Sequence, residues 1–295
     1  MRIGFCLPQY GTMGTEPGAV ARFAREAEAL GADSLWAGDR LLAPVKPVIG
    51  YGGGPGMPEE FRRSLDPFTV LAAAAAVTTT PLLGTSVLNA PYYSPAVLAR
   101  SLTTIDVLSG GRLIPGFGTG WSPDEFAAIG VAMNERGALL DECLDVLEAS
   151  WNQDTVAYQG RHFSIPESHS GLKPVQRPGP PVYLAGFAPT AMRRVATRSA
   201  GWLPAVQLTS GLSLSGIAAG WAVIREEAAK AGRPEPDFIL RVNAPAGTPV
   251  ADIVAAIGQA GRELSAGHVF VDLMYLAGSA DQALELAAQV LAAAR

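Results

Sequence analysis

The stretch LSGGRLIPGFGTGWSPDEF, residues 108–126, is the clearest strand–loop–helix unit of the chain. It predicts a short apolar strand at 112–115, a glycine-rich loop at 116–121 and a helix whose first turn carries Asp124 and Glu125. Alternating glycines let the backbone approach a bound molecule closely and turn its N–H groups toward it. Because α/β proteins bind ligands at the carboxyl ends of parallel strands, the loop is a candidate binding site. The alternative is a glycine loop needed only for a sharp turn.

The same strand–helix unit repeats along the whole chain. The predicted strands are 2–7, 33–37, 82–88, 112–115, 181–185, 201–205, 238–242 and 268–273. The predicted helices are 18–30, 67–77, 95–108, 134–151, 190–198, 214–231, 250–264 and 280–294. This alternation predicts an α/β fold, a closed (β/α)8 TIM barrel in a single domain over 1–295, with an open doubly wound sheet as the alternative.

Two segments interrupt the regular pattern, one after the second strand and one before the fifth. Residues 42–64 contain the run GYGGGPG at 50–56 and are expected to form a long mobile loop without a packed core. This loop leaves the carboxyl end of a strand, so we expect a lid over the substrate, the alternative being a surface insertion. Residues 155–177 predict a small hairpin followed by an extended, proline-rich connector.

Composition and charge exclude several classes of protein. The net charge of -5, with no basic stripe, argues against a nucleic-acid partner. The longest apolar run, 70–77, is far shorter than the about 20 residues that a membrane helix needs. Cys6 and Cys143 are too few for a disulfide framework, so a reducing cytoplasm is expected, and Cys143 falls on the apolar stripe of its helix.

The three histidines give no catalytic or metal-binding signature. His162 and His169 lack metal-ligand spacing with a carboxylate or cysteine, so no metal site is expected. His268 lies at a strand start, which is the stability end of a barrel, and is interpreted as structural. The glycine-rich loop is not the dinucleotide fingerprint either, because its third glycine comes too early.

Three motifs together resemble the bacterial-luciferase-like family, and within it the branch that uses the deazaflavin coenzyme F420. They are the opening stretch at 108–126, LGTSVLNAPYYSPAVLAR at 83–100 and GPPVYLAGFAPTAMRRVATRSAGWLPA at 179–205. The resemblance runs from residue 2 to about residue 205. It implies a (β/α)8 barrel with insertions, a flavin or deazaflavin lying across its C-terminal mouth, and hydride-transfer chemistry.

The resemblance also implies cofactor-binding positions. A cis peptide bond at Ser86–Val87 would support the ring, and Asn89 would bind its edge. The full implied set is Asp39, Ser86, Val87, Asn89, Gly118, Thr119, Gly120, Trp121, Gly186, Phe187 and Thr190. The last three precede a helix whose N-terminus suits the coenzyme phosphate. Arg193 and Arg194 could meet the anionic tail, or could equally be solvated helix arginines.

Two positions depart from the family pattern. Arg40 stands where several relatives have a proton-transferring histidine, and Trp121 stands where they have a glutamate acid/base. Arginine is a poor acid or base, but it can fix a carboxylate, phosphate or enolate oxygen. Arg40 and Asn89 are therefore the candidate polarising groups, with Tyr92 or Tyr93 as a possible proton donor. A sugar-phosphate dehydrogenase is not expected.

The sequence thus predicts a cytoplasmic oxidoreductase that moves a hydride between F420 and an unidentified conjugated or carbonyl-bearing substrate. The alternatives are an FMN-dependent monooxygenase of the same family and a non-catalytic flavin- or deazaflavin-binding protein. The expected partner is a small molecule, with neither nucleic acid nor membrane. A homodimer formed through the barrel helices is possible, because relatives commonly dimerise in this way.

Overall fold

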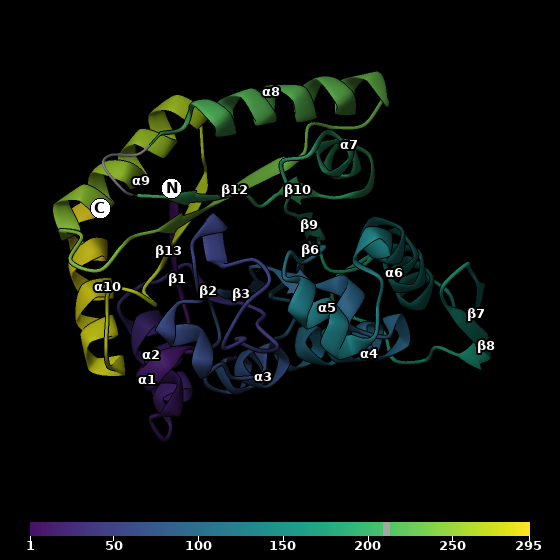
Figure 1. Ribbon diagram of the computed structural model, residues 1–295, viewed down its shortest axis with the longest axis horizontal. Coiled ribbons are helices and arrows are strands. Elements are labelled where there is room, and N and C mark those ends of the chain that lie inside the picture. Colours follow the sequence, from purple (N-terminus) through teal and green to yellow (C-terminus); the bar gives the residue numbers. More distant parts are fainter. Residues whose placement is uncertain (209–212) are drawn as a thin grey trace.

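A curled parallel sheet forms the centre of the molecule, and helices surround it (Figure 1). The computed structural model describes residues 1–208 and 213–295. The strands of this sheet are β1 (Arg2–Cys6), β2 (Ser34–Ala37), β3 (Leu82–Thr85), β4 (Leu88–Asn89), β5 (Leu113–Ile114), β6 (Gly116–Gly118), β9 (Tyr183–Leu184), β10 (Gly201–Trp202), β11 (Ala205–Gln207), β12 (Asp237–Asn243) and β13 (His268–Asp272). Their side chains are mostly apolar and buried, because both faces of the sheet are covered.

The strands pair in chain order around the sheet. β1 lies between β2 and β13, so the first and last strands of the chain are neighbours. The third and fourth predicted strands are each divided into two halves: β3 pairs with β5, and β4 pairs with β6. Two predictions are corrected here, because 82–88 is not one continuous strand and 116–118, expected to be loop, forms β6. The result is a TIM-barrel-like α/β fold.

The helices agree closely with the sequence pattern. They are α1 (Gly11–Thr15), α2 (Ala19–Ala29), α3 (Pro67–Val77), α4 (Pro95–Leu108), α5 (Pro123–Ile129), α6 (Arg136–Asn152), α7 (Pro189–Arg198), α8 (Ser215–Lys230), α9 (Val250–Leu264) and α10 (Ala280–Ala294). Asp66 caps α3 by accepting a 2.8 Å hydrogen bond from the Thr69 amide. On α6 the predicted apolar stripe is buried, and Cys143 packs within it. No helix in the described part of the chain is long and apolar enough to cross a membrane.

The long segment between β2 and α3 is better packed than the sequence suggested. It contains two short 3-10 turns, η1 (Tyr51–Gly53) and η2 (Glu59–Arg62). Phe61 is buried against Tyr10 and Met274, and Tyr51 packs edge-on against Phe61. The expectation that no packed core forms in this segment is therefore wrong, because two aromatic side chains anchor it to the barrel mouth.

The hairpin before β9 forms as predicted, from β7 (Thr155–Gln159) and β8 (Ser164–His169). It lies at the edge of the molecule, beside α6 and away from the central sheet (Figure 1). Glu142 of α6 accepts hydrogen bonds from the backbone amides of Arg161, His162 and Phe163. This single carboxylate therefore fastens the hairpin turn to the barrel.

His268 is buried at the start of β13, and its Nε2 lies 2.7 Å from the Ser34 hydroxyl. Burial lowers the pKa of His268 to about 4. The imidazole is therefore neutral near pH 7, in keeping with a structural role.

Candidate functional site

A cavity of about 450 Å³ opens where β4, β6 and β9 end. It brings together nine of the residues that the resemblance implied for the cofactor: Val87, Asn89, Gly118, Thr119, Gly120, Trp121, Gly186, Phe187 and Thr190. The cavity lies at the carboxyl ends of parallel strands, which is where this class of fold binds ligands. Binding of a cofactor by these residues stays a prediction.

Two glycines are required by the local geometry of this cavity. A Cβ at Gly118 would lie 2.7 Å from Cγ2 of Val87, so a side chain there would push β6 away from β4. Gly186 has a φ of +125°, a conformation that residues with a side chain rarely adopt. Both glycines line the cavity at positions that do not readily accept a side chain.

Ser86 lies beneath the cavity rather than on its wall. The peptide bond between Ser86 and Val87 is cis, as the resemblance implied. The Ser86 carbonyl accepts a 2.7 Å hydrogen bond from Nη1 of Arg241, a residue of β12. Arg241 also donates through Nε to Asn243, at 2.8 Å, and forms an ion pair with Asp272. This support could not be predicted from the sequence, because Arg241 and Asp272 belong to strands that are distant from Ser86 along the chain.

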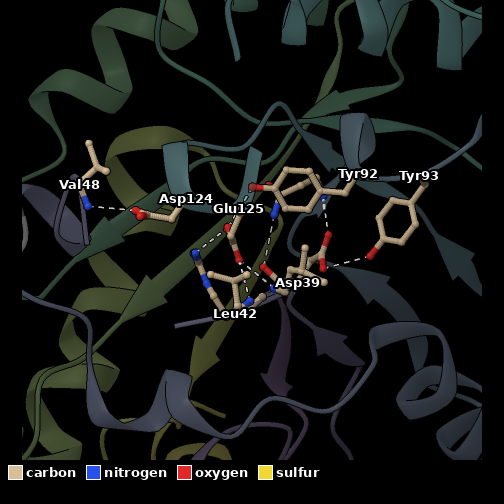
Figure 2. A network of polar contacts seen from close by, with 10 residues as sticks. Asp39, Leu42, Val48, Tyr92, Tyr93, Asp124 and Glu125 are labelled. Atoms are coloured by element: carbon tan, nitrogen blue, oxygen red, sulfur yellow. Dashed lines mark hydrogen bonds and ion pairs between the residues drawn. The ribbon is translucent and has the colours of Figure 1, made fainter. Parts of the chain in front are cut away.

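Asp39 does not line the cavity but holds a residue of its wall. Its Oδ2 accepts a 2.8 Å hydrogen bond from the backbone N–H of Asn89, and its Oδ1 accepts a 3.0 Å hydrogen bond from the Tyr93 hydroxyl (Figure 2). Burial raises the pKa of Asp39 to about 6. Burial and the neighbouring Asp39 raise the pKa of Tyr93 as well. Asp39 therefore holds Asn89 in place, and the Tyr93 hydroxyl is already engaged.

Arg40 is enclosed behind Trp121. Its Nη1 lies 2.8 Å from Oε2 of Glu125, and the two side chains are only 6% and 1% exposed. The Arg40 guanidinium carbon is 4.8 Å from the ring centroid of Phe61 and 4.8 Å from that of Trp121. Arg40 is not among the residues lining the cavity, so its expected role on a substrate oxygen would need a rearrangement.

Glu125 is a site residue that could not be identified from the sequence. Besides Arg40, its carboxylate accepts the Tyr92 hydroxyl at 2.9 Å and the Leu41 and Leu42 amides at 2.8 and 3.2 Å (Figure 2). Glu125 stands in the first turn of α5, where a carboxylate is favoured by the helix dipole. That signal was present in the sequence, but it did not reveal that Glu125 would be buried.

The opposite end of the cavity carries two arginines. Arg194 of α7 forms a two-pronged pair with Asp141, at 2.6 Å through Nε and 2.9 Å through Nη2. Arg136 of α6 donates to the Met133 carbonyl at 2.7 Å and forms no ion pair within 1–208 or 213–295. Arg193 is exposed and does not line the cavity. Arg136 could not be assigned to the cavity from the sequence, because it lies some 50 residues before β9, outside the motifs that form the cavity wall.

Within the described residues, no group of three or more His, Cys, Asp or Glu side chains could hold a metal ion. Cys6 and Cys143 are both free thiols. Burial raises the pKa of Cys143 to about 12, so this thiol is protonated at neutral pH. The chemistry of the site is therefore that of a shaped cavity with polar and cationic edges.

Several solved structures share the fold. The monooxygenase RslO1 of Streptomyces bottropensis superposes with a TM-score of 0.81 at 20% identity, covering 99% of this chain and 98% of that one. The coenzyme F420-dependent tetrahydromethanopterin reductase of Methanopyrus kandleri gives a TM-score of 0.69 at 18% identity, covering 98% and 97%. At these identities the likeness concerns the fold alone.

Comparison of sequences identifies the family as well as the fold. An uncharacterized protein of Mycobacterium tuberculosis is 35% identical over 195 residues, which are 64% of this chain and 67% of that protein. The FMNH2-dependent dimethylsulfone monooxygenase of Pseudomonas putida is 33% identical over 194 residues, 65% of this chain and 50% of that enzyme. A family model described as luciferase-like monooxygenase matches residues 1–293. The chain therefore belongs to the luciferase-like monooxygenase family.

Proposed function

We propose that the protein is an oxidoreductase that binds coenzyme F420 and transfers a hydride between it and an uncharacterised organic substrate. The observation that carries this proposal is the single cavity that gathers Asn89, Trp121 and Thr190 from three separate segments. The Methanopyrus reductase, which shares the fold, is named for F420. Family membership supports flavin or deazaflavin chemistry, and the choice of F420 is ours.

The residues present fit such a cofactor. A volume of about 450 Å³ lies in the usual range of ligand pockets, roughly 300–1,000 Å³. Val87, Leu140, Leu184 and Phe187 give apolar walls for a flat ring, while Arg136 offers a cation for an anionic arm. Gly118 and Gly186 line the cavity and carry no side chain that would fill it.

Each residue has a definite task in this proposal. When bound, the deazaflavin supplies the hydride-carrying carbon, and the protein supplies position and electrostatics. Asn89, held by Asp39, would bind the edge of the ring. Trp121, backed by Arg40, would form a rigid apolar wall that excludes water. The start of α7, together with Arg136, would hold the phosphorylated arm.

We further propose that the sheet closes as a (β/α)8 barrel in one domain, with its insertions after β2 and before β9. The two pairings between the divided third and fourth strands, β3 with β5 and β4 with β6, support this closure. The free thiols support a reducing, cytoplasmic location. A homodimer through the outer helices stays a proposal, which size-exclusion chromatography with light scattering would test.

Titration of the purified apoprotein with F420 and with FMN tests the cofactor assignment. We expect saturable F420 binding that is at least tenfold tighter than FMN binding, with loss of affinity in Asn89→Ala. Absence of F420 binding would refute the proposal.

An FMN-dependent monooxygenase is the second candidate. It is favoured by the 33% identity to the Pseudomonas putida enzyme, which is named for FMNH2. Oxygen consumption with reduced FMN would support this candidate and contradict the F420 assignment. Tight cofactor binding without turnover of activated alkenes, imines or ketones would instead indicate a binding protein.

A further inference from the structure

The cavity is electrically asymmetric. At the end formed by α6 and α7, Arg136 is half-buried and has no carboxylate partner among the described residues. At the end formed by β4 and the glycine-rich loop, Asn89 and Trp121 line the wall, and the cations close behind them are Arg40 and Arg241, each paired with a carboxylate. The two ends therefore differ in the charge that they present to a ligand.

Arg40 contributes almost no net positive charge to the wall at Trp121. Its guanidinium is paired with Glu125 at 2.8 Å, and both side chains are buried, so each charge cancels the other locally. The ring centroids of Phe61 and Trp121 both lie 4.8 Å from the guanidinium carbon. Its Nε is buried and has no hydrogen-bond partner in the described chain. Arg40 is thus enclosed and neutralised rather than presented to an anion.

The surroundings of this end carry no compensating positive charge. Arg241 is paired with Asp272, and Asp39 adds a negative charge when it is ionised. The adjacent barrel mouth is filled by the apolar cluster that includes Tyr10, Phe61 and Met274. An anion placed here would lose its hydration without gaining a free cation, which is strongly unfavourable.

We propose that the substrate, which would lie against the cofactor ring at the Asn89–Trp121 end, is an uncharged compound with an apolar body, and that anionic analogues are excluded from this end. Arg136, which has no carboxylate partner among the described residues, would bind the anionic arm of the cofactor instead. This inference rests on the proposed function and names its class of substrate. It also replaces the expectation that Arg40 fixes a substrate carboxylate or phosphate.

Cinnamamide and cinnamate test the inference, because they share a skeleton and differ in charge. Their binding would be measured by saturation-transfer NMR and by quenching of tryptophan fluorescence in the F420-loaded protein, where the Arg136 end is occupied. We expect cinnamamide to bind at least tenfold more tightly than cinnamate. Equal or tighter binding of cinnamate would overturn the proposal, whatever the behaviour of any variant.

Two neighbouring carboxylates of α5 give a matched pair of variants. Glu125→Gln keeps the shape of the side chain but releases the charge of Arg40, so cinnamate affinity should rise at least fivefold. Asp124→Asn removes the same charge one residue away, where the carboxylate accepts the Val48 amide at 3.0 Å and has no other partner among the described residues (Figure 2). It should change cinnamate affinity less than twofold. Equal effects of the two variants on cinnamate affinity would show that pairing with Glu125 is not what prevents Arg40 from attracting an anion.

Failure of the cofactor assignment can be told apart from failure of this inference. If F420 does not bind, the same two probes are compared in the Arg136→Gln apoprotein, which lacks the unpaired cation. A preference for cinnamamide there supports an uncharged ligand at the Asn89–Trp121 end, although the F420 proposal has failed. No preference in that variant overturns the inference itself.

Discussion

Replacing Glu125 with alanine should cost the protein a large part of its stability. The substitution leaves the Arg40 guanidinium, only 6% exposed, without its carboxylate partner. It also removes the acceptor of the Tyr92 hydroxyl and of the Leu41 and Leu42 amides. Breaking a buried ion pair by deleting one partner typically costs about 3–5 kcal/mol, because the remaining charge stays desolvated.

The expected size of the effect can be stated as a melting temperature. At about 2 °C per kcal/mol for a chain of this size, a loss of about 4 kcal/mol lowers the melting temperature by about 8 °C. Asp124→Ala is the control, because it removes one partly exposed hydrogen bond to the Val48 amide and should cost about 1 kcal/mol. Differential scanning calorimetry at one scan rate would measure both variants.

A double variant separates the ion pair from simple loss of packing. Arg40→Met combined with Glu125→Leu removes both charges and keeps apolar volume between Phe61 and Trp121. Replacing both partners of a buried pair is often neutral or stabilising, so the double variant should recover at least half of the loss. The reasoning is refuted if Glu125→Ala melts within 2 °C of the parent, or if the double variant melts no higher than Glu125→Ala.

Three further outcomes are expected. Because burial raises the pKa of Asp39 from 3.8 to about 6, the folded state binds more protons in that interval. The contribution of Asp39 to stability should therefore fall as pH rises from about 4 to 6, so the melting temperature of Asp39→Asn relative to the parent should rise over this interval. His268 contributes with the opposite sign: its pKa is lowered from 6.5 to about 4, so its contribution to stability should fall as pH drops through that range, and the melting temperature of His268→Gln relative to the parent should rise as pH drops. Glu142→Gln should increase hydrogen exchange at the backbone amides of residues 161–163 and leave the Leu41 and Leu42 amides protected. Unchanged exchange at 161–163 would show that Glu142 does not hold the hairpin turn.

The regular elements could be predicted because their signals are local. The apolar stripe of α6 and the proline at the start of α3 and α4 mark helices within a few residues of sequence. The strand regions are short apolar runs between them. The division of the third strand at Ser86 could come only from the family resemblance, since nothing in the residue types marks it.

The cavity wall could likewise be inferred from contiguous motifs, whereas its supports could not. Asn89 and Trp121 lie in recognisable sequence stretches. Glu125 and Arg40 are 85 positions apart, and Arg241 reaches Ser86 across 155 positions. Such pairs depend on which strands become neighbours in the sheet. A single sequence gives residue types and spacing, but it carries no record of which distant charges are buried together.

Because the third and fourth strands are each divided, one half of each contributes to the stability of the sheet and the other half contributes to the ligand site. The lower halves, β3 and β5, are tied to each other at the base, while the upper halves, β4 and β6, carry the ligand wall. Replacing only β4 and β6 with the corresponding segments of a relative should therefore change the ligand preference while the pairing of β3 with β5 stays unchanged. Glu125 sets a condition on such grafts: the loop following β2 must be transplanted with them, because the α5 carboxylate accepts hydrogen bonds from the Leu41 and Leu42 amides of that loop.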